Sequence, residues 1–249
     1  EDLTEAIALA HDLGHTPCGH AGQDALNRCM PPYGGFEHNF QSLRVVDHLE
    51  EKYAQFAGLN LTFESREGIL KHCSKSNARQ VGMVGERFLN MTQPSLEAQL
   101  VNLADQIAYN NHDVDDGLRA GLITIEQLCE IYLFREQYET VVSSYPKLNQ
   151  RRTIHEVVRR MINRLVIDIV ETSEKNLAEA MPENIETVRQ HNGPLICFSE
   201  EQARLKHELK HFLREKLYRH YRVMRMTLKA ERILSELFEA FLGEPRLLP

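Results

Sequence analysis

The chain has 249 residues, 42% of them hydrophobic and 26% charged, which is ordinary for a globular protein. No apolar run approaches the ~18 residues that cross a bilayer, and no basic-then-apolar leader opens the chain, so we expect no membrane partner and a cytoplasmic protein. Five scattered cysteines without a CxxC pair suggest neither a zinc ribbon nor a disulfide framework. The formal net charge of −7 argues against a surface coated with basic groups for nucleic acid.

Helical spacing of apolar residues predicts an all-α fold. Apolar side chains recur at three- and four-residue steps, whereas the alternation typical of strands is scarce. Loops are indicated by "PPYGG" (31–35), "SSYP" (143–146) and "HNGP" (191–194). The expected helices, the last interrupted near 216–226, cover 4–12, 38–56, 95–117, 124–142, 153–180, 183–191 and 199–242.

The first polar motif is "ALAHDLGHTPCGHAG" (8–22), where a helix is expected to end. Gly14 cannot comfortably continue the helix, so His11 and Asp12 lie at its C-terminal end. An imidazole nitrogen beside a carboxylate suits Mn, Fe, Ni, Zn or Co. A plain hydrogen bond at the helix end is the alternative. The glycine-proline turn that follows carries His15 and His20, and imidazoles near a metal suit an anionic, phosphate-bearing substrate.

A second motif, "FEHNFQSLR" (36–44), opens the next helix. Its polar residues are Glu37, His38, Asn39 and Gln41, and a helix N-terminus is a favourable place for an anion. Asn39 could instead be the N-cap, and Glu37 a first-turn charge. His38 has no such local role, and it is therefore a candidate for the site.

A third motif, "LADQIAYNNHDVDD" (103–116), places Asp105, Tyr109 and either His112 or Asp113 on one helix face. Carboxylates are costly to bury without a partner, so a metal or a substrate sugar explains Asp105 and Asp113. The alternative is a solvated acidic end of the helix formed by the aspartates at 113, 115 and 116.

Together, "HDLGHTPCGHAG", "FEHNFQSLR" and "EAQLVNLADQIAYNNHDVDDG" resemble the deoxyguanosinetriphosphate triphosphohydrolase-like family of the HD-domain metal-dependent phosphohydrolases. The resemblance continues through "GLITIEQL" (121–128) and "YRHYRVMRM" (218–226). It implies an HD-domain helical bundle with additional C-terminal helices. We expect a core with the metal and substrate site in residues 1–145, and a C-terminal helical region in residues 146–249.

The resemblance also implies a divalent metal, Mg, Mn or another transition metal, held by His11, Asp12 and Asp105. One further histidine ligand is expected upstream of residue 1, because the family's first motif precedes the point at which this chain begins. The implied reaction cleaves a deoxynucleoside triphosphate into deoxynucleoside and triphosphate, by water attack on the α-phosphorus. Such a metal polarises the phosphate and lowers the pKa of its water.

The implied roles extend to residues around the metal. His20 and His38 are candidate proton donors to the leaving 5′ oxygen, and His15 a phosphate contact. The carboxylate of Glu37 is a candidate helper for the histidines. The remaining candidates are expected to contact the substrate. Tyr109 would contact the deoxyribose, and the other three would contact the sugar or the phosphates: Asn39, Gln41 and Asp113.

One departure from the family is Gln23, where many members carry an acidic residue. It leaves His20 without that carboxylate unless Asp24 or Glu37 serves. The basic stretch near the C-terminus offers Tyr218, Arg219 or Arg222 to a triphosphate or to a neighbouring subunit, although a solvated helix explains it nearly as well.

The expected partners are a deoxynucleoside triphosphate, further copies of the chain in a homo-oligomer, and a nucleotide or nucleic-acid effector. Two alternatives stay open. The chain could be another HD phosphohydrolase, a nucleotidase or phosphodiesterase. It could also be a nucleotide-sensing or nucleic-acid-binding protein with little catalysis.

Overall fold

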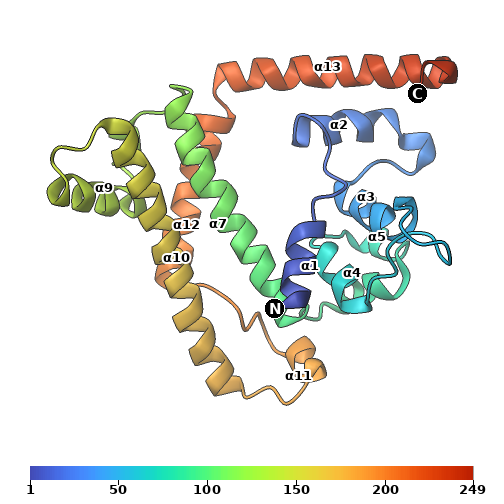
Figure 1. The fold of residues 1–249 in the computed structure, drawn as a ribbon, viewed down its shortest axis with the longest axis horizontal. Helices are drawn as coiled ribbons and strands as arrows, with labels where there is room; N and C mark the ends of the chain where they lie inside the picture. Colours follow the sequence, from blue (N-terminus) through green and yellow to red (C-terminus); the bar gives the residue numbers. More distant parts are fainter. Residues whose placement is uncertain (249) are drawn as a thin grey trace. The chain divides into compact units, whose positions relative to one another are not determined.

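The computed structural model describes residues 1–248, Ser76 by its backbone alone, and these residues form helices and loops without a strand (Figure 1). The all-α prediction is therefore confirmed. The α-helices are α1 (Asp2–Ala10), α2 (His20–Cys29), α3 (His38–Arg44), α4 (Phe63–Ile69), α5 (Lys75–Ala78), α6 (Glu86–Asn90), α7 (Leu96–Arg119), α8 (Ile125–Leu128), α9 (Tyr132–Ser144), α10 (Gln150–Ala180), α11 (Ile185–Gln190), α12 (Glu200–Phe212) and α13 (Tyr221–Gly243). Two π-helical turns, Val45–Leu49 and Leu213–Tyr218, extend α3 and α12.

The chain divides into two compact units. The first contains residues 1–101 together with 224–249, and the second contains residues 102–223. Both α7 and α13 run through a boundary between units. Residue 145 lies inside the second unit, and the expected division into 1–145 and 146–249 stays a prediction.

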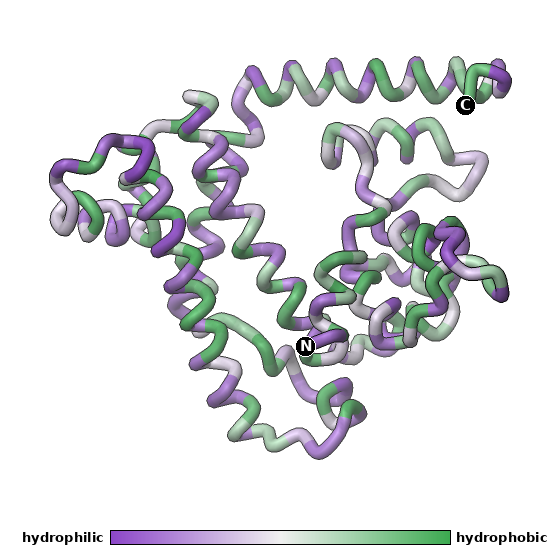
Figure 2. Tube along the Cα trace, in the orientation of Figure 1, coloured by the Kyte–Doolittle hydropathy of each residue, from purple (hydrophilic) through white to green (hydrophobic). Residues whose placement is uncertain are grey.

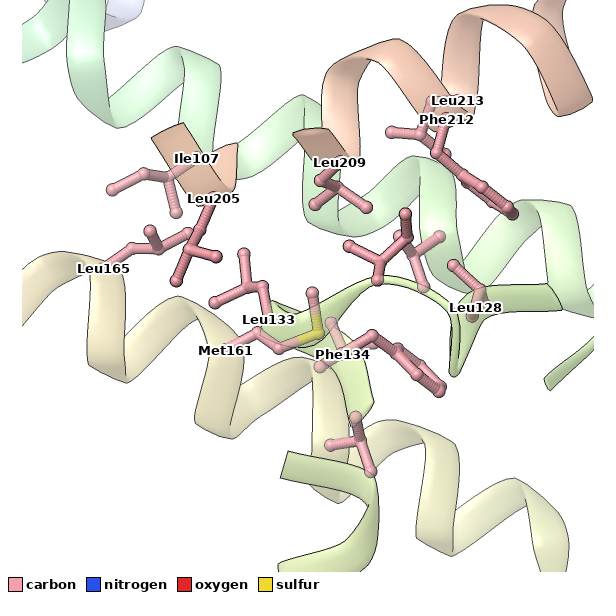
Figure 3. Close-up of a cluster of buried hydrophobic side chains, with 14 of the residues drawn as sticks. Ile107, Leu128, Leu133, Phe134, Met161, Leu165, Leu205, Leu209, Phe212 and Leu213 are labelled. Carbon is pink, nitrogen blue, oxygen red and sulfur yellow. The ribbon is translucent and has the colours of Figure 1, made fainter. Parts of the chain in front are cut away.

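The second unit has a large apolar core (Figure 3). Leu133 and Phe134 of α9 and Met161 of α10 are completely buried. Side chains of α12 and its π-helical extension complete the cluster from the other end of the unit's sequence: Leu205, Leu209, Phe212, Leu213 and Leu217. Burial of aliphatic and aromatic groups in this cluster is the main stabilising contribution to the unit.

The first unit is built around smaller apolar clusters. Ile7 of α1 is fully buried in one of them, and Ala10 joins Leu43 and Ile69 in another. Gly68 of α4 lets α4 pack closely against α1, because a Cβ at this position would lie 2.3 Å from the Cδ1 of Ile7. This packing fixes the end of α1, where the first polar motif begins.

Two predicted helices differ from the structure. The helix expected over 38–56 ends at Leu49, and residues 51–53 have no regular structure. The chain turns back there, since the Leu59 amide donates to the Val46 carbonyl at 2.7 Å. The helix expected over 124–142 is divided into α8 and α9, because Ile131 adopts an extended backbone between them.

The interruption expected near 216–226 is confirmed, since helix α12 with its extension ends at Tyr218 and α13 starts at Tyr221. Apolar and polar residues alternate along α13, as the changing colours in Figure 2 show. Among the described residues, no helix combines the length and apolarity that crossing a membrane requires. The short helices α2, α4, α5 and α6 were not predicted.

We expect Gly14→Ala to lower the free energy of unfolding by about 1–3 kcal/mol, the usual cost of overpacking. A Cβ at Gly14 would lie 2.2 Å from the Ser42 nitrogen and 2.5 Å from the His38 carbonyl oxygen, and both are backbone atoms. Urea unfolding measures the loss. Gly243→Ala is the control, since nothing lies within 4 Å of its Cβ position, and an equal effect in both variants would contradict the prediction.

Candidate active site

The C-terminal end of α1 carries the first pair of candidate ligands. Helix α1 ends at Ala10, and His11 is its C-cap, as predicted. The His11 backbone carbonyl accepts a hydrogen bond from the Ser42 hydroxyl at 2.8 Å, and that hydroxyl accepts one from the Gly14 amide at 2.9 Å. Helix α3 therefore fixes the position of the pair, which explains the close approach at Gly14.

The imidazole of His11 is oriented for binding a cation. Its Nδ1 lies 2.9 Å from the Ala8 carbonyl oxygen, which can only accept, so Nδ1 carries the proton. In the neutral ring Nε2 then bears the lone pair, and it lies 3.3 Å from an Asp12 carboxylate oxygen. Two electron-rich atoms at this distance call for a positive charge, either a proton or a metal ion. The donor set therefore fits the divalent metal that the sequence predicts.

The turn after the pair positions the next histidines. The Thr16 hydroxyl donates to the Gly19 carbonyl at 2.8 Å and closes the turn. Both Cys18 and Gly19 have a φ of +63°. The backbone of Gly19 also has a ψ of −145°, and this combination is strained for any residue that carries a side chain. Helix α2 starts immediately afterwards with His20.

Three imidazoles from two segments form a cluster. The ring centroids of His15 and His38 are 5.4 Å apart, those of His15 and His20 6.0 Å, and those of His20 and His38 6.2 Å. Burial lowers the pKa of His38, the neighbouring imidazoles lower it further, and the carboxylate of Glu37 opposes this. The structure thus brings together the three histidines that the sequence predicts for the site.

The residues around His38 have more specific positions than the sequence indicates. Glu37, and not Asn39, is the N-cap of α3, because its carboxylate accepts from the Phe40 amide at 3.3 Å. Asn39 is buried and donates to Glu37 at 2.7 Å. Glu37 and Gln41 line a cavity of about 500 Å³ together with Arg44 and other residues of the first unit. Their roles toward substrate stay predictions.

The other candidates lie on α7 in the second unit: Asp105, Tyr109 and Asp113. The Tyr218 hydroxyl donates to the Asp113 carboxylate. Burial raises the pKa of Asp113, and the hydrogen bond from Tyr218 partly offsets this. Burial and the bond to Asp113 also raise the pKa of Tyr218, which stays protonated at neutral pH. This pair was missed, because no local pattern links residues so distant in sequence. Arg219, a further candidate for the triphosphate, forms an ion pair with Glu215, in which a guanidinium nitrogen lies 2.7 Å from a carboxylate oxygen.

We expect Tyr218→Phe to lower the free energy of unfolding at pH 7 by about 1 kcal/mol, since a half-buried carboxylate loses its donor. The loss shrinks as the pH falls through the raised pKa of Asp113, because a protonated carboxyl needs that donor less. Denaturant unfolding at several pH values measures this, with Tyr33→Phe, at a tyrosine that is 61% exposed, as the control. A loss that is independent of pH would contradict the link to Asp113.

Comparison with known proteins agrees with the motifs. The HD domain model matches residues 1–110, and the phosphohydrolase-associated domain model matches residues 196–249. A Bordetella pertussis protein named deoxyguanosinetriphosphate triphosphohydrolase-like is 64% identical over the whole chain. The chain belongs to the deoxyguanosinetriphosphate triphosphohydrolase-like family of HD-domain proteins.

Other members of this family are similarly close. The proteins of the same name from Thiobacillus denitrificans and Nitrosomonas europaea are 60% and 58% identical over the whole chain. The chain spans 66% of the length of these relatives and of the Bordetella protein. Because the chain spans only this part of its relatives' length, phosphohydrolase activity and metal dependence are proposals for it.

Proposed function

We propose that the protein hydrolyses a deoxynucleoside triphosphate resembling dGTP, and releases deoxynucleoside and triphosphate. The observation that carries this proposal is the close grouping of His15, His20 and His38 in the unit that also holds the His11–Asp12 pair. Imidazoles donate hydrogen bonds to phosphate oxygens and exchange protons near neutral pH. The names of the relatives favour a purine deoxynucleotide as substrate.

We further propose that Asp105 binds the same divalent metal as His11 and Asp12, giving one imidazole and two carboxylates as ligands. A histidine upstream of residue 1 is proposed as a further ligand. When bound, such an ion stabilises charge on the α-phosphate and lowers the pKa of the attacking water.

Other residues of the chain are proposed to bind the substrate and to transfer protons. His15 donates hydrogen bonds to the phosphates, and His20 delivers a proton to the leaving 5′ oxygen. Tyr109 and Asp113 bind the deoxyribose, and Gln41 and Asn39 support the phosphate side. A homo-oligomer, a nucleotide or nucleic-acid effector and a cytoplasmic location are also proposed.

The inorganic product tests this function. Purified protein, both residues 1–249 and the product of the complete reading frame, is incubated with dGTP and Mn²⁺ or Mg²⁺. Ion chromatography then identifies the phosphate species. Triphosphate with deoxyguanosine is the expected result. Pyrophosphate alone would indicate a different HD phosphohydrolase, and tight binding of dGTP without turnover would indicate a nucleotide sensor; either contradicts the proposal.

A further inference from the structure

Gln23 of α2 makes two contacts with His38 of α3. Its side-chain oxygen accepts a hydrogen bond from the His38 backbone amide at 3.1 Å. Because a backbone N–H requires an acceptor, this bond settles which end of the Gln23 amide faces His38. The same oxygen also lies against the His38 Nδ1.

The second contact determines where the imidazole proton resides. An amide oxygen accepts hydrogen bonds and cannot donate them, so Nδ1 must be the protonated nitrogen. In the neutral ring Nε2 then carries the lone pair, and the ring centroid lies 5.4 Å from that of His15 and 6.2 Å from that of His20. Glu37 has a carboxylate oxygen 3.3 Å from the same Nδ1, and it favours the same tautomer.

We infer that Gln23 is a positioning residue, whose amide oxygen holds His38 in the Nδ1–H tautomer and thereby presents Nε2 as a proton acceptor. The tautomer of His38 is independent of the proposed function, and only its use as a proton acceptor in catalysis rests on that function. It makes His38 the acceptor of the cluster and leaves His20 as its proton donor. It also explains the glutamine: a neutral amide orients the ring without the charge by which a carboxylate stabilises the imidazolium.

The surroundings of His38 agree with a neutral ring. Burial is the largest cause of its lowered pKa, and the imidazoles of His15 and His20 act in the same direction. The carboxylates of Glu37 and Asp12 act against it. A glutamate at position 23 would add a third carboxylate, closer than Asp12, and would shift this balance toward the cation.

The test reads the tautomer directly by long-range ¹H–¹⁵N correlation spectra of protein labelled with ¹⁵N-histidine, recorded across pH without metal or substrate. The His38 signals are assigned by their loss in His38→Asn. In the wild-type protein we expect a protonated Nδ1 and an unprotonated Nε2 above the pKa. Neutral His38 protonated at Nε2 would overturn the inference, whatever the activity assays show.

Three variants separate Gln23 from Glu37. Gln23→Met should reduce the Nδ1–H form, whereas Glu37→Gln should retain it. Gln23→Glu should also retain it and raise the pKa of His38 by about 1 or more. Gln80→Met, an exposed glutamine in the same unit, is the matched control and should leave the spectrum unchanged. A full Nδ1–H population in Gln23→Met would assign the orientation to Glu37 alone and refute the role of Gln23.

Discussion

Asp12→Asn is expected to reduce dGTP turnover by more than about 100-fold, because changes to residues that merely support metal ligands already cost about 10–100-fold. The substitution keeps the size of the side chain but removes the negative charge that faces the His11 Nε2 at 3.3 Å. An amide is a poor substitute for a carboxylate as a ligand of a divalent cation. Turnover of dGTP and Mn²⁺ binding by titration calorimetry are measured together.

Two comparisons make this result specific. Glu5→Gln removes an exposed carboxylate from the same helix, and it should retain both activity and metal binding. Asp12 is half exposed, so its replacement should leave the unfolding midpoint nearly unchanged. Asp12→Asn protein that keeps both its turnover and wild-type affinity for Mn²⁺ would show that the ion lies elsewhere. Retained metal with lost turnover would instead argue for a role in proton transfer.

The sequence was sufficient for the parts of the molecule that local patterns determine. Helical spacing predicted α7, α10 and the interruption before α13, because long amphipathic helices repeat their pattern many times. The end of α1 at His11 followed from Gly14, which lies three residues later. The short helices α4, α5 and α6 have few turns, so tertiary contacts rather than periodicity decide whether they form.

The site shows the same division between local and tertiary information. The grouping of His15, His20 and His38 could be expected from their motifs. The sequence offers Asn39 as an alternative N-cap of α3. In the structure Glu37 is the N-cap, and the side chain of Asn39 is buried. The bond between Gln23 and His38 depends on how α2 meets α3, and the bond between Tyr218 and Asp113 joins residues far apart in the chain. Neither has a signal in sequence spacing.

Arg87→Met is expected to have the largest effect on stability, about 3–5 kcal/mol, the usual cost of breaking a buried ion pair. The Arg87 Nε lies 4.0 Å from the Glu67 carboxylate, and their side chains are 11% and 2% exposed. The guanidinium also donates to the Leu70 carbonyl at 2.6 Å. Burial lowers the pKa of Arg87 to about 10, and the carboxylate of Glu67 counteracts this, so the guanidinium is charged at neutral pH.

The size of this effect comes from what the substitution leaves behind. Methionine can fill the space of the Arg87 stem, but the carboxylate of Glu67 loses the Arg87 guanidinium while it stays in the interior of the first unit. The double variant Glu67→Gln with Arg87→Met removes that charge as well and should recover at least about half of the loss. Arg79→Met, at an exposed arginine, should change stability by less than about 0.5 kcal/mol. Urea unfolding monitored by circular dichroism measures all three. A double variant no more stable than Arg87→Met would assign the loss to the Leu70 carbonyl rather than to Glu67.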